Sequence, residues 1–252
     1  MATQEGILPI KGTIGNITFF KSKDGYLVRQ KGGVSASQIA NSPAYQRTRE
    51  NGAEFGRACK AGKTLRTAFR AAVQNVSDRR MVSRLAKKMM EVIHADSTSD
   101  RGLRNVIDGE ATLLEGFEFN ENGNLGGCFA AAYTAAIDRV SGKGTISIPA
   151  FLPSEMLQSP GGTTHFKMIA AIAAIDFENQ LNSNDAIETA LLPWDNTATA
   201  AISLEATITA NSTHPLFLVL GISFYQEMNG KNYSLNNGTF NCLAIVKVDT
   251  GV

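Results

Sequence analysis

Apolar and polar residues recur at the period of an α-helix between residues 43 and 94. Ser42 and Pro43 form a start signal, because a serine oxygen can cap free amides and proline is tolerated in the first turn. At about 100° per residue, the apolar and small residues after this signal share one side of a helix. They are Phe55, Ala58, Ala61, Gly62, Leu65, Phe69, Ala72, Val73 and Val76.

A second helical stripe follows a second start signal at Ser77 and Asp78. Its apolar members are Met81, Leu85, Met89 and Val92. A polar break over residues 96–100 ends this stripe, and residues 101–107 are predicted to form a short third helix. The pattern therefore predicts two amphipathic helices and a shorter one after them.

Basic side chains occupy the side of both helices that lies opposite the apolar stripes. They are Arg57, Lys60, Lys63 and Arg70, with Arg66 at the border, and then Arg80, Arg84 and Lys87, with Lys88 at the edge. Such a face is often no more than a solvated helix surface. Here, however, fourteen basic residues stand against seven acidic ones between residues 43 and 108. The imbalance favours contact with acidic groups of another subunit or with a polyanion.

Residues 12–33 carry a strong β-hairpin pattern. Ile17, Phe19, Tyr26 and Val28 belong to two β-prone runs, which a tight turn at Asp24-Gly25 separates. A lone hairpin is only marginally stable in water, so we expect this one to dock on a sheet. The sheet is either the C-terminal part of the same chain or the sheet edge of a neighbouring subunit, and these four residues are the candidate contact.

From residue 111 onward the pattern changes to that of β-strands. Strand-like runs bounded by Asn, Ser, Thr, Pro and Gly occur over residues 113–119, 128–137, 139–149, 166–177, 199–210, 216–227 and 240–248. Antiparallel strands in this number predict a β-sandwich. The predicted fold class is α+β, with a hairpin arm over residues 1–41, a basic helical segment over 42–108 and an acidic β-sandwich over 109–252.

Charge divides the chain more sharply than its net value of +1 suggests. Residues 1–108 hold nineteen basic and nine acidic residues, whereas residues 109–252 hold five and fourteen. The two parts thus carry net charges of +10 and −9. The basic part can bind a polyanion or meet the acidic part of another copy. The two parts can also face each other within one monomer.

The sequence contains no recognisable catalytic or metal-binding motif. Cys59, Cys128 and Cys242 lie far apart, which indicates free buried thiols and no zinc site. The three histidines are isolated, and nucleophile-elbow, zincin, P-loop and dinucleotide-binding patterns are absent. We therefore expect no enzymatic activity, no metal and no cofactor, and we identify no small-molecule substrate.

Glycan binding is a further alternative for the β-rich part. Trp194 or Tyr225 could stack on a sugar ring, although core packing is the more common role of such residues.

The N-terminal residues lack a Sec-type signal, and the apolar runs are too short to span a bilayer as helices. The expected location is the cytoplasm, and export by another route stays open.

Two segments resemble a group of uncharacterised Bacteroidota proteins of similar length. They are GTIGNITFFKSKDGYLVRQKGG at residues 12–33 and SPAYQRTRENGAEFGRACKAGKTLRTAF at residues 42–69. The resemblance extends to GTTHFK at 162–167, LPWDNTATA at 192–200 and the closing strands, so it covers most of the chain. It implies a bacterial source, and it transfers neither a function nor catalytic residues.

The leading hypothesis is a non-enzymatic structural subunit that assembles with copies of itself into a ring, tube or filament. In this hypothesis the hairpin completes a neighbour's sheet, and the basic helical face meets acidic residues of another subunit. Nucleic-acid binding by the same basic face is the first alternative, and glycan binding is the second.

Overall fold

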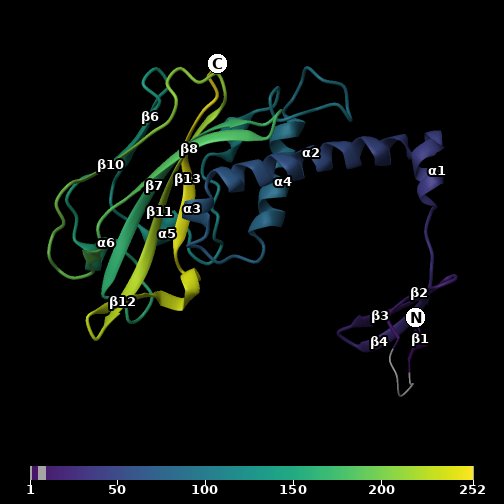
Figure 1. Cartoon of the computed structure of the whole chain (residues 1–252), viewed down its shortest axis with the longest axis horizontal. Helices are drawn as coiled ribbons and strands as arrows, with labels where there is room; N and C mark the ends of the chain where they lie inside the picture. Colours follow the sequence, from purple (N-terminus) through teal and green to yellow (C-terminus); the bar gives the residue numbers. More distant parts are fainter. Residues whose placement is uncertain (1, 5–9, 252) are drawn as a thin grey trace. The chain divides into compact units, whose positions relative to one another are not determined.

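The computed structural model describes residues 2–4 and 10–251, which form two compact units, Met1–Arg49 and Glu50–Val252. The chain combines an antiparallel N-terminal sheet, helices and a larger antiparallel β-structure (Figure 1). The predicted α+β class is therefore confirmed.

The N-terminal unit contains a four-stranded antiparallel sheet with the order β1-β4-β3-β2. Its elements are β1 (Ala2–Thr3), β2 (Gly12–Ile14), β3 (Ile17–Ser22) and β4 (Gly25–Gln30), followed by α1 (Ala36–Asn41) and the 3₁₀ turn η1 (Pro43–Tyr45). The predicted hairpin is the β3–β4 pair, closed where Ser22 pairs with Gly25. Gly25 has φ 107°, a conformation that favours glycine. Two further short strands widen the hairpin into a sheet.

Three helices follow the η1 turn. They are α2 (Gln46–Ala68), α3 (Arg70–Val73) and α4 (Met81–His94). The buried side of α2 includes Glu54, which is 1% exposed, whereas Phe55 is 53% exposed. The prediction that Phe55 belongs to the apolar side is therefore wrong. The stripe through Ala58 and Leu65 continues four residues earlier at Glu54, and the Glu54 Oε1 accepts a hydrogen bond from the Gly102 amide at 2.8 Å.

The predicted short helix over residues 101–107 is not formed. This segment consists of turns held by side chains, because Asp96 accepts hydrogen bonds from the amides of Ser99 and Asn105. The Arg57 Nη1 donates to the carbonyl oxygens of Gly102 and Arg104, at 2.8 and 2.9 Å. Side-chain hydrogen bonds of this kind compete with the helical backbone for the same groups.

Two antiparallel sheets form the β-rich part of the second unit. The larger contains β7 (His165–Asp176), β8 (Leu181–Glu188), β9 (Leu192–Pro193), β11 (Leu216–Met228), β12 (Lys231–Ser234) and β13 (Cys242–Asp249). The smaller contains β5 (Thr134–Asp138), β6 (Lys143–Ile148) and β10 (Ile202–Thr207), in the order β10-β6-β5. The remaining short elements are η2 (Ala111–Leu114), α5 (Leu125–Cys128), α6 (Pro153–Met156) and η3 (Leu235–Gly238).

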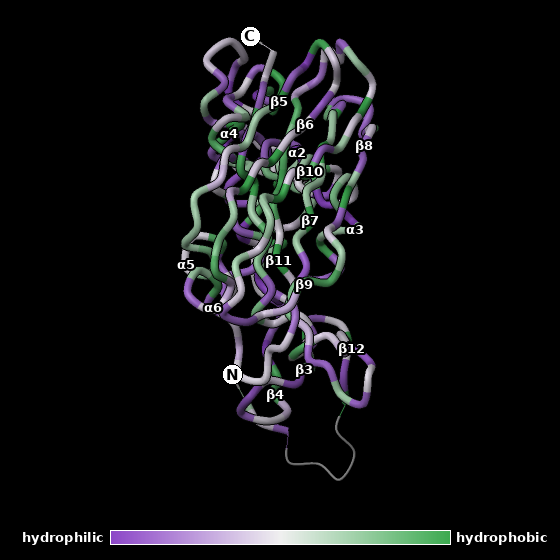
Figure 2. The backbone as a smooth tube through the Cα atoms, turned by 90° about the vertical axis from the view of Figure 1, so that its left-hand side faces the viewer, coloured by the Kyte–Doolittle hydropathy of each residue, from purple (hydrophilic) through white to green (hydrophobic). Residues whose placement is uncertain are grey.

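The central strands β7 and β11 are buried on both faces. Ile169, Ile175 and Phe217 belong to a core shared with α2 and α4, whereas Ile172 and Leu218 belong to a second core shared with β6 and β10. Successive side chains of a strand point to opposite faces, so the larger sheet is covered by helices on one face and by the smaller sheet on the other. Figure 2 shows the resulting concentration of hydrophobic residues along β7 and β11. Strands buried on both faces read as nearly continuous apolar runs.

Two predicted strands have a different structure. Residues 113–119 include the end of η2 and then an irregular segment beside β13, where the Gly116 and Phe119 amides donate to Ile245 and Leu243. Residues 128–137 include the end of α5 and most of β5. Both segments still lie against the sheets, because their apolar residues fill the two cores.

Candidate assembly surfaces

The four hairpin residues selected from the sequence share one face of the N-terminal sheet. Phe19 lies opposite Val28, and Tyr26 lies opposite Lys21. Ile17 lies two residues before Phe19 and therefore on the same side. Ile17 is 44% exposed, and Phe19, Tyr26 and Val28 are partly exposed. The predicted contact residues thus form one accessible apolar surface.

None of the described residues in the N-terminal unit is buried. Exposed apolar side chains include Ile10 at 47% and Ile14 at 62%. Cations lie against aromatic rings, with the Lys21 Nζ 5.6 Å from the Tyr26 ring centre and the Arg29 guanidinium 5.2 Å from that of Phe20. This unit therefore combines a hydrogen-bonded sheet, exposed apolar residues and positive charge, and its described residues form no buried core.

Three of the nine predicted basic residues of the helices make contacts within the fold. Arg57 binds the two carbonyl oxygens of the 101–107 segment, and Lys88 forms an ion pair with Glu91 at 2.7 Å. Arg84 binds the Asp78 carboxylate at 2.5 Å and the Glu118 carbonyl oxygen at 2.8 Å. Arg57 and Arg84 thus connect segments that are distant in the chain, whereas Lys88 pairs only within its own helix.

The other six basic residues leave a smaller cationic surface. Lys60, Lys63, Arg70, Arg80 and Lys87 are exposed, and Arg66 is partly buried. α2 carries Lys60, Lys63 and Arg66, and α4 carries Lys87. The structure therefore retains a basic helical surface, although it contains fewer available cations than the sequence pattern predicted.

Two carboxyl groups near Arg84 have opposite pKa shifts. Burial alone would raise the pKa of Asp78, but its hydrogen bonds with Arg84 and with the amides of Arg80 and Glu121 lower it overall. Burial raises the pKa of Glu118 to about 7 and outweighs the hydrogen bond from the Leu125 amide. The Oε2 of Glu118 is buried without a hydrogen-bond partner among the described residues. No sequence motif marks Glu118.

The strand β8 is an exposed, acidic strand of the larger sheet. It pairs with β7 along its whole length, and most of its residues are exposed. Leu181 is 63% exposed and Ile187 is 37% exposed. Asp185 lies on the same face as Ile187, whereas Glu188 points to the other face and forms an ion pair with Lys167 at 3.3 Å. Apolar and acidic side chains therefore occur together on this strand.

Several chemical expectations can be compared with the structure. Cys128 and Cys242 are buried, whereas Cys59 is exposed, so the expectation of a buried thiol is wrong for Cys59. Within residues 2–4 and 10–251, no group of three His, Cys, Asp or Glu side chains could hold a metal ion. None of the helices in this part of the chain has the length and apolar character needed to cross a membrane.

No family model and no curated protein matches the sequence. Among solved structures, a weak likeness is found to a chain described under "pH-induced modulation of Streptococcus parasanguinis adhesion by Fap1 fimbriae". The TM-score is 0.22 and the sequence identity is 11%, over 45% of this chain and 78% of that chain. A likeness at this level carries no argument about function.

Proposed function

We propose that this protein is a non-enzymatic structural subunit that assembles with copies of itself. In the proposed contact, the N-terminal sheet of one copy packs against the acidic β-structure of the next. The observation that carries the proposal is a four-stranded sheet in which no described residue is buried.

Hydrophobic burial is the main physical reason for such a contact. Units of this size usually need an additional source of stability, and small sheets need a packed hydrophobic face. Covering apolar surface contributes about 25 cal/mol for each Å² removed from water. Ile14, Ile17 and the partly exposed Phe19 would supply such surface to a partner.

Charge supports a second copy as the partner. The first unit carries seven basic and two acidic residues, a net charge of +5, whereas residues 109–252 carry −9. We assign the surface that receives this sheet to β8, where Leu181 and Ile187 offer apolar contacts and Asp185, on the same face of the strand, offers negative charge. Complementary charges accelerate association and select the partner.

A contact between two different surfaces of the same chain is heterologous. Repeated contacts of this kind close into a ring if the rotation allows it, and otherwise they continue as a tube or filament. Because the contact is partly electrostatic, high salt should weaken it.

The test combines light scattering after size exclusion, at low and high salt, with negative-stain microscopy. We expect large, ordered, salt-sensitive particles of the wild-type chain. We call the apolar face of the N-terminal sheet the donor surface and the exposed face of β8 the acceptor surface. Ile17→Asp should reduce the particles to small species, because it places a negative charge in the donor surface. Ala44→Asp makes the same charge change in the exposed η1 turn and serves as the control.

A complementation experiment identifies the two surfaces separately. Ile187→Lys should disable the acceptor surface and leave the donor sheet intact. Either variant alone should stay small, whereas a mixture should form a limited complex through the one intact donor and the one intact acceptor. A salt-independent wild-type monomer would refute the proposal, and unchanged particles of both variants would refute the assigned surfaces.

Nucleic-acid binding is the second candidate, favoured by the exposure of Lys60, Lys63 and Lys87. It predicts a steep loss of DNA or RNA affinity with salt, measured by fluorescence anisotropy. Reversal of Lys60 and Lys63 to glutamate should then weaken binding to all sequences alike. No affinity at 50 mM salt would exclude this candidate.

A further inference from the structure

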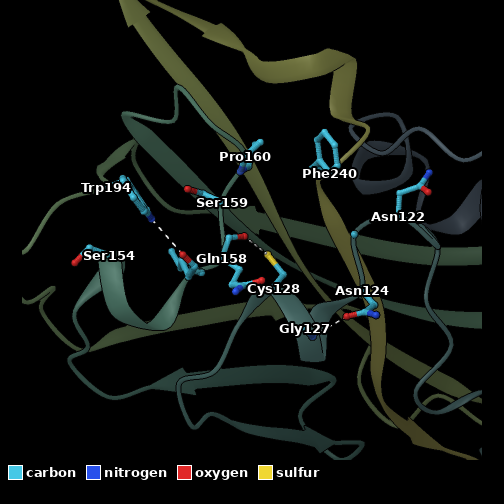
Figure 3. A pocket seen from close by; sticks show the side chains of 12 residues that line it. Asn122, Asn124, Gly127, Cys128, Ser154, Gln158, Ser159, Pro160, Trp194 and Phe240 are labelled. Atoms are coloured by element: carbon cyan, nitrogen blue, oxygen red, sulfur yellow. Dashed lines mark hydrogen bonds between the residues drawn. The ribbon is translucent and has the colours of Figure 1, made fainter.

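A cavity of about 610 Å³ opens on the second unit, and none of its lining residues was assigned to assembly. Loops around α5, α6, β9 and the start of β13 supply its walls. The lining includes Asn122, Cys128, Gln158, Ser159, Trp194 and Phe240. Figure 3 shows Gln158 and Cys128 between Trp194 on one side and Phe240 and Asn124 on the other.

None of the lining residues carries a charged side chain. This is unusual in a part of the chain with a net charge of −9, where five cations and fourteen acids are available. A site for a phosphate, a nucleotide or a carboxylate is expected to contain cations or a set of converging amides. The lining therefore favours a neutral ligand.

Two aromatic rings line the cavity. The Trp194 amide donates to the Thr164 carbonyl oxygen at 2.8 Å, and the Trp194 Nε1 donates to the Leu157 carbonyl oxygen at 3.4 Å. These bonds fix the indole at the edge of the core while part of its surface stays accessible. Phe240 is 44% exposed. An exposed, oriented aromatic ring can pack against the apolar C–H face of a sugar ring.

Neutral hydrogen-bonding groups also line the cavity. The side chains of Asn122, Gln158 and Ser159 make no hydrogen bond within residues 2–4 and 10–251. Each amide can donate and accept at once, which matches the paired donor and acceptor character of sugar hydroxyls. The cavity also lies within the range of 300–1,000 Å³, roughly, that small-molecule sites occupy.

We propose that this cavity binds a neutral carbohydrate, with Trp194 and Phe240 packing on sugar rings and Asn122 and Gln158 binding hydroxyl groups. The sequence suggested Trp194 or Tyr225 as the ring that stacks on a sugar, and the cavity retains only Trp194 of these two. Tyr225 lies on β11 and does not line the cavity, whereas Phe240 does. The site is independent of the assembly surfaces, so either proposal can fail without the other.

The chain contains a single tryptophan, so intrinsic fluorescence reports on Trp194 alone. We would titrate the full chain with soluble neutral oligosaccharides built from glucose, mannose, galactose and N-acetylglucosamine. We expect at least one series to change the emission in a saturable way, and a sulfated glycan of equal length to have no effect.

Phe240→Ala should weaken that binding about tenfold, because it removes one aromatic contact. Gln158→Ala should weaken it as well, and both positions are exposed, so the fold should be retained. Tyr233→Ala, which removes an aromatic ring that is 55% exposed on β12, is the matched control and should leave affinity unchanged. The proposal is overturned if no neutral oligosaccharide changes the emission at millimolar concentration, or if Phe240→Ala and Gln158→Ala bind like wild type.

Discussion

Replacement of Arg84 by methionine separates a structural role from a ligand-binding role. The sequence places Arg84 on the basic face of a helix, whereas the structure places it against Asp78, Phe117 and the Glu118 carbonyl oxygen. Methionine preserves much of the aliphatic length and removes the charge. We therefore expect the variant to lose stability, although a free surface arginine would contribute almost nothing.

The expected loss follows from the environment of Asp78. Its side chain is 5% exposed, and removal of one partner from a buried ion pair costs about 3–5 kcal/mol. Asp78 keeps hydrogen bonds from the amides of Arg80 and Glu121, and the Arg84 side chain is 26% exposed, so the lower part of that range applies. A loss of about 3 kcal/mol should lower the Tm by roughly 6–12 °C for a unit of this size.

Thermal and urea unfolding of the full chain, followed by circular dichroism, measure this loss. Lys87→Met, on the exposed side of the same helix, is the control and should change stability by less than about 0.5 kcal/mol. The pKa of Asp78 is lowered in the folded chain, so the contribution of the pair is present above pH 3.8 and disappears as the pH falls through the lower folded pKa. Equal stability of Arg84→Met and Lys87→Met at pH 7 would refute the reasoning.

Two further predictions concern the β-rich unit. Because the folded pKa of Glu118 is raised from 4.5 to about 7, the stability of the wild-type chain should fall as the pH rises through this interval. Glu118→Gln should flatten that dependence and add roughly 1–2 kcal/mol at pH 8, allowing for partial solvent access; a pH profile parallel to wild type would contradict this. Gly144→Val should cost about 1–3 kcal/mol in urea unfolding, because a Cβ atom there would lie 2.8 Å from Leu218 and 3.0 Å from Ile172. Ser147→Val, at an exposed position of the same strand, is its control. Equal stabilities of the two variants would contradict the prediction.

Local patterns in the sequence were sufficient for much of the fold. The β3–β4 hairpin was predicted because a tight turn and two β-prone runs are adjacent in the chain. The stripe from Met81 to Val92 was predicted from its helical spacing, and all its members are buried in α4. The apolar runs at β7 and β11 predicted strands of a sandwich, although they did not predict that helices cover the second face.

Polar partners that are distant in the chain account for the main errors. Glu54, rather than Phe55, faces the interior because Gly102, 48 residues later, supplies a hydrogen-bond donor. Arg57 is not available to a partner, because carbonyl groups 45 and 47 residues away accept its hydrogen bonds. Helical periodicity reports only which residues share a side, and it contains no information about such partners.

The sequence by itself therefore determined the order of the elements, the division of charge and the apolar faces, because each depends on residues that are close in the chain. Only the tertiary structure decided which cations are available, that β8 is an exposed acidic strand, and that Trp194 and Phe240 line one cavity. β8 has no apolar run that would mark it, and the cavity is built by loops from residue 122 to residue 240. Its residues come together only because the two sheets and their cores fix the ends of those loops.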